Sequence, residues 1–204
     1  MRVNKKKFIY LISPNRIKKS FYNDLVEILK LKKVGFFQLR LKKTSFKKKL
    51  FIGKKVKKIC NKYNTKFLVN DDVLLAKKLN TDGCHLGQKD MKILEARKIL
   101  KKKIIGITCH NSIKLAKLAI NNRADYLAFG AFNISKTKKT KYKADINLLK
   151  KIKKITNTPI VAIGGINFDN YKKLLLNKAN FLAISGYIWN NKKLKPVEAI
   201  KKLV

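Results

Sequence analysis

The sequence predicts one (β/α)8 TIM barrel, an α/β fold, spanning residues 1–204. Three observations predict it. Eight short runs of β-branched and aromatic residues recur along the chain, lysine-rich segments with apolar residues at three- and four-residue steps lie between them, and polar or glycine residues follow the runs at the same end. A doubly wound sheet is the alternative, but it rarely needs eight evenly repeated units. No linker or change of composition indicates a second domain.

The runs are expected to form strands because each is rich in residues that favour extended backbone. In chain order they are 8–13, 36–41, 66–70, 83–87, 104–109, 126–130, 159–164 and 181–186. Eight helices are expected to alternate with them, and helical spacing is seen in segments such as 20–33, 45–63, 91–102, 111–122, 143–155, 167–177 and 196–203. Asn111 and Asp145 are expected to cap the fifth and sixth helices. The one long polar loop after a strand is 131–142, and such loops are usually functional.

The chain is strongly basic. It carries 51 Lys and Arg against 11 Asp and Glu, a formal net charge of +40, and only five of its basic residues are Arg. Such a charge is typical of nucleic-acid binding. However, the lysines are spread over almost every expected helix, and Arg, which favours bidentate phosphate and base contacts, is scarce. Because Asn, Ile, Tyr and Phe are also plentiful, the pattern favours compositional bias over a specific nucleic-acid partner.

Three cysteines, Cys60, Cys84 and Cys109, form an odd set without CxxC spacing, which indicates neither a disulfide framework nor a zinc site. The apolar run near the N-terminus is too short for a signal peptide, and no run approaches the length of a membrane span. We therefore expect a cytoplasmic protein with reduced thiols and no membrane association. The sequence leaves open whether the chain forms homo-oligomers.

Lysine dominates most of the chain, but four of the eleven acidic residues lie within twenty positions. They are Asp71, Asp72, Asp82 and Asp90. Asp71 and Asp90 follow neighbouring expected strands, so their carboxylates can converge. Mg2+ is usually held by one or two carboxylates together with substrate phosphate and water. The two residues are therefore candidate Mg2+ ligands. The alternative is that Asp71 caps the third helix and Asp90 the fourth.

Amide and cationic side chains end the second expected strand. Gln38, Arg40 and Lys42 alternate with Leu39 and Leu41, so the three polar side chains share one direction and the leucines point to the helices. An Arg in a chain that prefers Lys favours a fork-shaped contact with phosphate, and the set suits a diphosphate. The alternative is a strand end whose charges reach into water.

Small residues follow the last two strands. Gly164-Gly165 and Ser185-Gly186 match the phosphate site of many such barrels, in which loop amides bind a monophosphate. His85, inside an apolar strand, is expected to be a hydrogen-bonded core residue, Trp189 a packing residue and His110 a candidate site residue. The two histidines lack the spacing of metal ligands.

Several segments together resemble the thiamine-phosphate synthase family, in matching order and spacing along nearly the whole chain. They are QLRLK at 38–42, ND at 70–71, DGCHLGQKDM at 82–91, GITCHN at 106–111, SKTKK at 135–139, VAIGGI at 161–166 and AIS at 183–185. The resemblance implies a (β/α)8 barrel that joins 4-amino-2-methyl-5-(diphosphooxymethyl)pyrimidine to a phosphorylated 4-methyl-5-hydroxyethylthiazole and releases pyrophosphate. It also implies Mg2+ as cofactor, held by Asp71 and Asp90.

The resemblance implies roles for further residues. Contacts to the pyrimidine diphosphate would come from Gln38, Arg40, Lys42, Asn70, Thr108 and Lys138. Further substrate-binding residues would be Leu39, Leu41 and Lys136. The thiazole phosphate would be bound by Ser135, Thr137, Gly165, Ile184 and Ser185. Displacement of diphosphate from the aminopyrimidine methylene is expected to be dissociative, so the catalytic residues would be the leaving-group cations Arg40, Lys42 and Lys138. An attacking thiazole nitrogen requires no general base.

The chain departs from the family pattern in three places. Thr108 stands where the family usually has Ser, the loop after the sixth strand lacks the family's Pro, and Ser135 replaces a Thr. Three alternatives stay open. A thiazole tautomerase on the same barrel needs neither metal nor diphosphate, another phosphosugar-type barrel would need only the phosphate site, and a basic, non-catalytic nucleic-acid-binding barrel would use only the charge.

Overall fold

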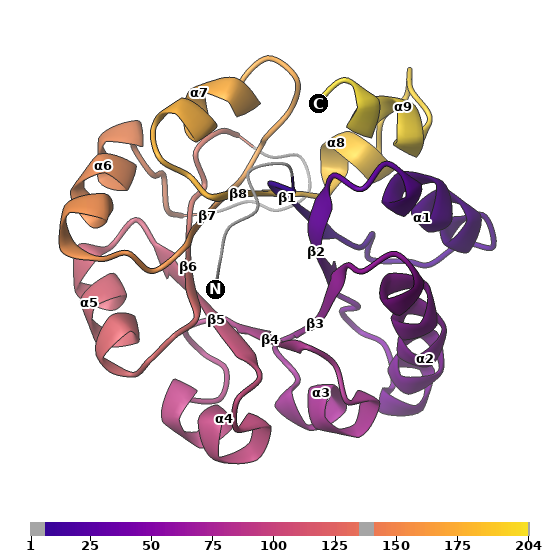
Figure 1. The fold of residues 1–204 in the computed structure, drawn as a ribbon, viewed down its shortest axis with the longest axis horizontal. Helices are drawn as coiled ribbons and strands as arrows, with labels where there is room; N and C mark the ends of the chain where they lie inside the picture. The colour runs from indigo at the N-terminus through magenta and orange to yellow at the C-terminus, as the bar shows by residue number, and fades with distance from the viewer. Residues whose placement is uncertain (1–6, 135–140, 204) are drawn as a thin grey trace.

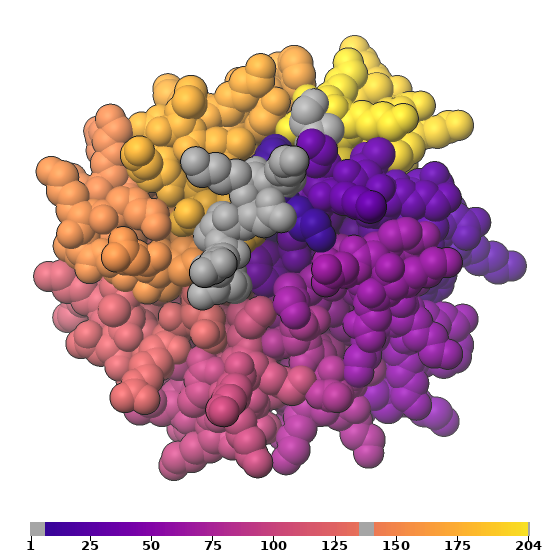
Figure 2. Space-filling model, viewed as in Figure 1, coloured from indigo at the N-terminus to yellow at the C-terminus, as the bar shows by residue number. Residues whose placement is uncertain are grey.

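Eight parallel strands close into a barrel, as the sequence predicts. The computed structural model describes residues 7–134 and 141–203. The strands follow one another in chain order, and β1 pairs with β8 to close the barrel. Figure 1 shows the ring of strands inside a ring of helices. In Figure 2 the first and last parts of the chain, indigo and yellow, lie side by side on the surface.

All eight expected strands are present. They are β1 (Ile9–Ile12), β2 (Val34–Leu39), β3 (Lys66–Asn70), β4 (Gly83–Leu86), β5 (Ile104–His110), β6 (Tyr126–Phe129), β7 (Ile160–Ile163) and β8 (Phe181–Ile184). The expected bounds of 36–41 are wrong for β2, which begins and ends two residues earlier. It ends at Leu39 because the Arg40 N–H donates to the Ser13 hydroxyl, 2.9 Å away, and not to a neighbouring strand. Arg40 and Lys42 therefore lie in the loop after β2.

The described residues form nine α-helices. They are α1 (Phe21–Lys30), α2 (Phe46–Lys62), α3 (Val73–Leu79), α4 (Ile93–Leu100), α5 (Ile113–Asn121), α6 (Ile146–Ile155), α7 (Tyr171–Leu176), α8 (Gly186–Trp189) and α9 (Pro196–Lys201). Seven of them fall within the segments expected to be helical. The seven residues of α3 form the expected third helix, and α8 is an additional helix of four residues.

The helix caps are partly as expected. Asp145 caps α6, where its carboxylate accepts the Asn147 N–H at 2.7 Å. The expected cap at Asn111 is wrong, because the neighbouring Ser112 is the N-cap of α5 and its hydroxyl accepts the Leu115 N–H at 3.2 Å. The amide of Asn111 instead donates to a backbone carbonyl, that of Lys143. Asn111 thus connects the end of β5 to the segment before α6.

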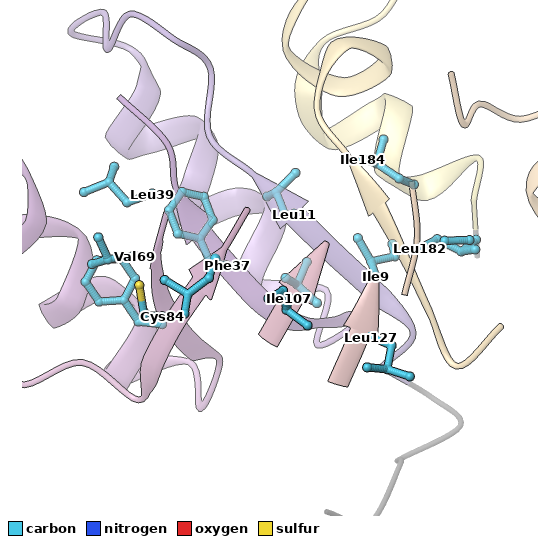
Figure 3. Close-up of a cluster of buried hydrophobic side chains, with 14 of the residues drawn as sticks. Ile9, Leu11, Phe37, Leu39, Val69, Cys84, Ile107, Leu127, Leu182 and Ile184 are labelled. Carbon is cyan, nitrogen blue, oxygen red and sulfur yellow. The ribbon is translucent and has the colours of Figure 1, made fainter. Parts of the chain in front are cut away.

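Two layers of apolar side chains fill the structure, because side chains alternate along each strand. Outward-facing residues pack against the helices, as Figure 3 shows for Ile9, Leu11, Phe37, Leu39, Val69, Cys84, Ile107, Leu127, Leu182 and Ile184. Inward-facing residues fill the barrel: Tyr10, Ile12, Phe36, Leu68, Tyr126, Ala128, Val161, Phe181 and Ala183. The barrel interior is therefore a packed core.

Trp189 and the cysteines agree with the sequence analysis. The Trp189 ring packs at 5.2 Å from that of Phe21, and its indole N–H donates to the Ile12 carbonyl at 2.7 Å. The three cysteines are buried and free, and burial raises the pKa of the Cys109 thiol to about 12. In the described part of the chain, no helix is long and apolar enough to cross a membrane.

Gly106 makes room for Tyr126 inside the barrel. A Cβ atom at Gly106 would lie 1.8 Å from Cζ of the fully buried Tyr126 ring, so Gly106→Ala must displace that ring. We expect the free energy of unfolding to fall by about 1–3 kcal/mol, as measured by urea denaturation. Gly53→Ala is the matched control, because its Cβ meets only the end of the Leu79 side chain and Ala favours a helix by about 1 kcal/mol. Equal destabilisation by both substitutions would contradict this account.

Candidate active site

The described residues that the sequence places at strand ends gather at one end of the barrel, because parallel strands share the direction of their carboxyl ends. They are Gln38, Arg40, Lys42, Asn70, Asp71, Asp90, Thr108, Gly165, Ile184 and Ser185. The other expected site residues, Ser135, Lys136, Thr137 and Lys138, lie outside the described residues. The site is therefore described from the loops after β2, β3, β4, β5, β7 and β8.

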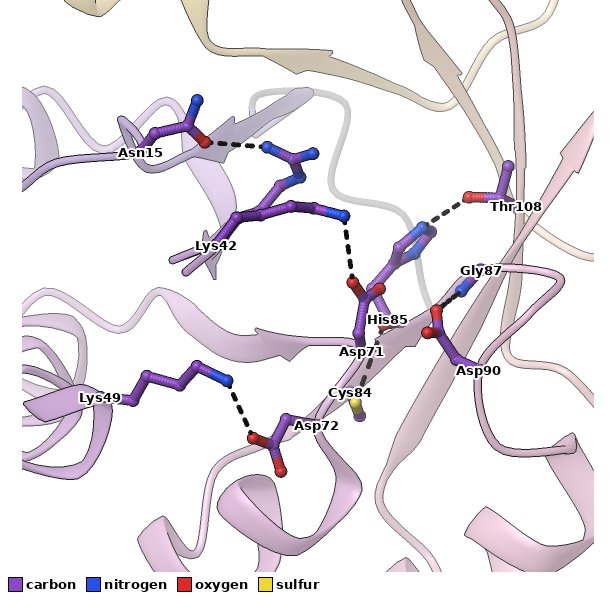
Figure 4. A network of polar contacts seen from close by, with 11 residues as sticks. Asn15, Lys42, Lys49, Asp71, Asp72, Cys84, His85, Gly87, Asp90 and Thr108 are labelled. Carbon is purple, nitrogen blue, oxygen red and sulfur yellow. Dashed lines mark hydrogen bonds and ion pairs between the residues drawn. The ribbon is translucent and has the colours of Figure 1, made fainter. Parts of the chain in front are cut away.

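Asp71 directly follows β3 and has a left-handed backbone, with a φ of 64°. Aspartate adopts this conformation more readily than most residues. The Asp71 N–H donates to the His85 carbonyl at 2.7 Å, which continues the pairing of β3 with β4. The capping alternative is wrong for Asp71, because Asp72 caps α3 and accepts the Leu75 N–H at 2.9 Å. The Asp71 carboxylate instead points toward Lys42 (Figure 4).

Asp90 lies in a tight turn after β4. Its carboxylate accepts the Gly87 N–H at 2.7 Å, and its own N–H donates back to the Gly87 carbonyl at 3.3 Å. The capping alternative is wrong here too, because the N-cap of α4 is Lys92. The turn thus holds the Asp90 carboxylate in place close to Asp71 (Figure 4).

Burial and the neighbouring carboxyl both disfavour the charged form of Asp71. Burial, followed by a hydrogen bond and charge repulsion from Asp90, raises the pKa of Asp71 from 3.8 to about 6. Lys42 and Arg40 act in the opposite direction, and Lys42 Nζ lies 3.8 Å from Asp71 Oδ2. The raised pKa means that these cations do not fully offset the burial and the second carboxyl. Two converging carboxylates of this kind form an oxygen-donor site that suits a divalent cation.

The raised pKa of Asp71 predicts a pH dependence of stability. Between pH values of about 4 and 6 the folded protein binds more protons at Asp71 than the unfolded chain does, because the folded pKa is the higher one. The contribution of Asp71 to the free energy of unfolding therefore falls as the pH rises through this window. In metal-free buffer, wild type should lose more stability than Asp71→Asn from pH 4 to pH 6 in urea titrations. A larger loss in Asp71→Asn would contradict the assignment.

Arg40 is positioned by the loop after β1. Its Nη1 donates to Asn15 Oδ1 at 3.0 Å, and its backbone N–H donates to Ser13 Oγ. Burial lowers the pKa of Arg40 while Asp71 raises it, and a guanidinium stays charged at neutral pH. The Ser13 contact fixes the backbone and the Asn15 contact holds the planar guanidinium at the barrel mouth, where it suits bidentate contact with a phosphate group.

A groove of about 590 Å³ lies between the loops after β1 and β2. Its lining consists of Asn15, Arg16, Ile17, Leu41, Lys42, Lys43, Thr44, Lys48 and Ile52. Four of these described residues are cationic and none of them is acidic. The groove therefore attracts anions toward Lys42 in its lining and toward Arg40 in the same loop.

His85 is a hydrogen-bonded residue of the interior, as expected. Its Nδ1 lies 2.7 Å from the Tyr126 hydroxyl and its Nε2 lies 2.9 Å from Thr108 Oγ1. Burial lowers the pKa of His85 to about 4, so the imidazole is neutral at pH 7. His110 ends β5, where its ring stacks on Tyr142 with centroids 4.0 Å apart, and its role in the site stays a prediction.

The glycine pair after β7 allows a close approach of backbones. Gly164 and Gly165 have φ angles of 104° and 59°. A Cβ atom on Gly165 would lie 2.4 Å from the Ile134 carbonyl oxygen, and the Asn133 N–H donates to the Gly164 carbonyl at 3.1 Å. The loops after β6 and β7 therefore pack against each other in a way that requires glycine.

Three of the expected binding residues direct their side chains into the layer between strands and helices. Leu39, Leu41 and Ile184 belong to that cluster and are buried, so a ligand at the mouth could meet only their backbone atoms. Ser185 is the N-cap of α8, and its hydroxyl donates to the Ser13 carbonyl at 3.3 Å. Asn70 is the last residue of β3 and lies level with His85.

The sequence analysis missed four residues that position this site. Ser13 and Asn15 follow β1, and the polar stretch Ser-Pro-Asn-Arg after an apolar strand is a signal that could have identified them. Tyr10 and Tyr126 lie inside strands β1 and β6, where an aromatic residue ordinarily packs. The contact between their hydroxyls has no sequence signal, because it joins residues 116 positions apart.

Known proteins resemble this chain over nearly its full length. A family model described as thiamine monophosphate synthase matches residues 9–188. A protein named thiamine-phosphate synthase from Pelagibacter ubique is 71% identical over 206 residues, covering 100% of both chains, and one of the same name from Erythrobacter litoralis is 37% identical over 201 residues, covering 96% and 94%. The solved structure of a thiamine phosphate pyrophosphorylase from Pyrococcus furiosus superposes with a TM-score of 0.86 at 29% identity, covering 98% of this chain and 94% of the other.

Proposed function

This chain belongs to the thiamine monophosphate synthase family, and we propose that it is a transferase that joins 4-amino-2-methyl-5-(diphosphooxymethyl)pyrimidine to 4-methyl-5-(2-phosphooxyethyl)thiazole, giving thiamine phosphate and pyrophosphate. One observation carries the proposal: the paired carboxyls of Asp71 and Asp90 face the cations Arg40 and Lys42 at the barrel mouth. Carboxylates and cations together suit a magnesium diphosphate. A thiazole tautomerase needs neither a metal nor a diphosphate site.

Asp71 and Asp90 fit an Mg2+ ion. Their oxygens are the ligands that this hard cation prefers. Burial and then the nearby Asp90 carboxyl raise the pKa of Asp71, and a bound cation would offset both effects. Among the described residues there is no group of three or more His, Cys, Asp or Glu that could hold a metal. The substrate diphosphate and water would therefore complete the coordination. When bound, the ion would neutralise charge on the departing diphosphate.

Arg40 and Lys42 would stabilise the same leaving group. The C–O bond between the pyrimidine methylene and the diphosphate breaks first, because the electron-rich aminopyrimidine ring can stabilise a methylene cation. Negative charge then grows on the diphosphate, and cations already held in place stabilise it without reorganising. The Asn15 contact keeps Arg40 in position for this role. Lys138 would add a third cation.

The thiazole would bind at the opposite side of the mouth. We assign its phosphate to the backbone amides of Gly165, Ile184 and Ser185, with Ser135 and Thr137 contributing hydroxyls. Binding there would hold the ring nitrogen beside the methylene cation, so that it attacks before water does. The nitrogen carries no proton at the attacking lone pair, and no general base is needed.

The test is to incubate the protein with both substrates and Mg2+ and to measure thiamine phosphate and pyrophosphate. Equal amounts of the two products, dependent on both substrates, are expected. Nucleic-acid binding is tested in parallel by a salt titration with RNA in a filter-binding assay. A steep salt dependence without any thiamine phosphate would contradict the proposal and favour a basic binding protein.

A further inference from the structure

A continuous chain of hydrogen bonds crosses the barrel interior directly beneath the site. Gln38 Nε2 lies 3.0 Å from the Tyr10 hydroxyl, which lies 2.8 Å from the Tyr126 hydroxyl. The Tyr126 hydroxyl contacts His85 Nδ1, and His85 Nε2 contacts Thr108 Oγ1. These hydrogen bonds thus join Gln38 on β2 to Thr108 on β5, and both residues are expected to bind the pyrimidine diphosphate.

The residues that form these hydrogen bonds are buried, so each of their donors and acceptors needs a partner. Tyr10 and Tyr126 are 1% and 0% exposed, and Gln38 is 2% exposed. A buried hydroxyl proton without an acceptor costs free energy, so each hydroxyl in the chain should donate as well as accept. Burial also raises the pKa of both tyrosines, which therefore keep their protons.

One direction of donation satisfies every link. The Gln38 amide nitrogen can only donate, so the Tyr10 oxygen accepts from it and the Tyr10 proton goes to the Tyr126 oxygen. The Tyr126 proton then goes to His85 Nδ1, which must be an unprotonated acceptor. The reverse direction would leave the Tyr10 proton without an acceptor among its described partners.

From this we infer that Tyr10, Tyr126 and His85 are positioning residues. The two tyrosines hold His85 as the Nε2–H tautomer, and the Thr108 hydroxyl accepts from that N–H group. Thr108 therefore turns its own hydroxyl proton toward the oxygen of a bound ligand. The Thr108 hydroxyl has one proton, and the Nε2–H group occupies one of its lone pairs. The proton is then available to an acceptor such as a phosphate oxygen. This role rests on the proposed function, whereas the tautomer does not.

The tautomer can be measured in the free protein. The chain has two histidines, so long-range ¹H–¹⁵N spectra of the imidazoles are simple, and His110→Gln identifies the signals of His85. At pH 7 and in the absence of substrates, His85 is expected to be neutral and protonated at Nε2. A His85 protonated at Nδ1, or one that exchanges between the two tautomers, would overturn the inference whether or not the protein makes thiamine phosphate.

The consequence for the ligand is tested with variants that keep the shape of the interior. Tyr126→Phe should allow His85 to adopt either neutral tautomer, and Thr108→Val should remove the hydroxyl donor. Each should raise the KM for the pyrimidine diphosphate on the order of tenfold, the effect of one hydrogen bond, with little change in the KM for the thiazole phosphate. Thr108→Ser restores the hydroxyl and should restore the KM.

Tyr171→Phe is the matched control, because Tyr171 is a buried tyrosine on α7 outside the barrel interior. It should change neither the His85 spectrum nor the KM for the pyrimidine diphosphate. An unchanged His85 spectrum in Tyr126→Phe, or an equal rise in KM for both substrates in Thr108→Val, would show that the chain has only a structural role. A wild-type protein that makes no thiamine phosphate would overturn the proposed function and leave the tautomer result standing.

Discussion

Asp71→Asn and Asp90→Asn are each expected to lower kcat/KM on the order of 10²–10³-fold, the effect of removing one preorganised electrostatic contact to the leaving group. The amide group of Asn has the shape of the carboxylate but lacks the negative charge that attracts Mg2+. The loss should appear in kcat and not only in KM, because charge grows on the diphosphate in the transition state. Steady-state kinetics at saturating Mg2+ measure it.

These substitutions should leave the fold intact. Neither residue caps a helix, Asn tolerates the left-handed backbone at position 71, and an amide at position 90 can still accept the Gly87 N–H. Above pH 7, Asp71→Asn should be at least as stable as wild type, because it removes a partly buried charge beside a second carboxyl.

Asp72→Asn is the matched control for the carboxylate pair. Asp72 is adjacent in sequence, but it caps α3 and contacts Lys49 at 3.2 Å, and Asn is also a good N-cap. Its kinetics should stay close to those of wild type. Full activity in Asp71→Asn, or an equal loss in Asp72→Asn, would show that the Asp71 charge has no specific role in the reaction.

Arg40→Lys is expected to cost about 1–3 kcal/mol of transition-state stabilisation, or roughly 5- to 150-fold in kcat/KM, although the charge is kept. A lysine cannot form the two parallel hydrogen bonds of a guanidinium with a phosphate group. It would also lose the guanidinium contact with Asn15. The same assay measures the effect with the pyrimidine diphosphate as the varied substrate.

Arg16→Lys is the control for Arg40. Arg16 lines the same groove but is exposed, so its effect should be confined to salt-dependent attraction of the substrate. At high salt Arg16→Lys should match wild type, whereas the defect of Arg40→Lys should persist. Wild-type kinetics in Arg40→Lys would mean that this side chain is only a solvated loop residue.

Most of the barrel could be predicted from sequence because its strands are local patterns. The bounds of β3 agree with the expected 66–70, where an apolar run meets the polar pair Asn70-Asp71. The end of β2 could not be predicted, since it depends on a contact between Arg40 and Ser13, 27 residues apart. Helix α8, with four residues, was too short for a periodic pattern to identify.

The site, like the fold, could be predicted only in part from the sequence. Neighbouring strand ends predicted that the carboxyls of Asp71 and Asp90 converge, and after burial the hydrogen bond between them contributes to the raised pKa of Asp71. The sequence could not decide against capping, because aspartate is common both at helix N-caps and in a left-handed backbone. The left-handed backbone at Asp71 makes Asp72 the N-cap of α3. The hydrogen bonds beneath the mouth depend on residues from different strands, and spacing along the chain does not show them.

Calorimetric titration of Mg2+ tests the joint metal and diphosphate site most directly. At pH 8 the protein alone should bind Mg2+ weakly, because two carboxylates and water form an incomplete shell. A non-reacting analogue of the pyrimidine diphosphate should tighten Mg2+ binding, and Mg2+ should tighten analogue binding by the same factor. Both effects should disappear in Asp71→Asn and Asp90→Asn and persist in Asp72→Asn. Unchanged coupling in the first two variants would contradict the assignment of the metal to this pair of carboxylates.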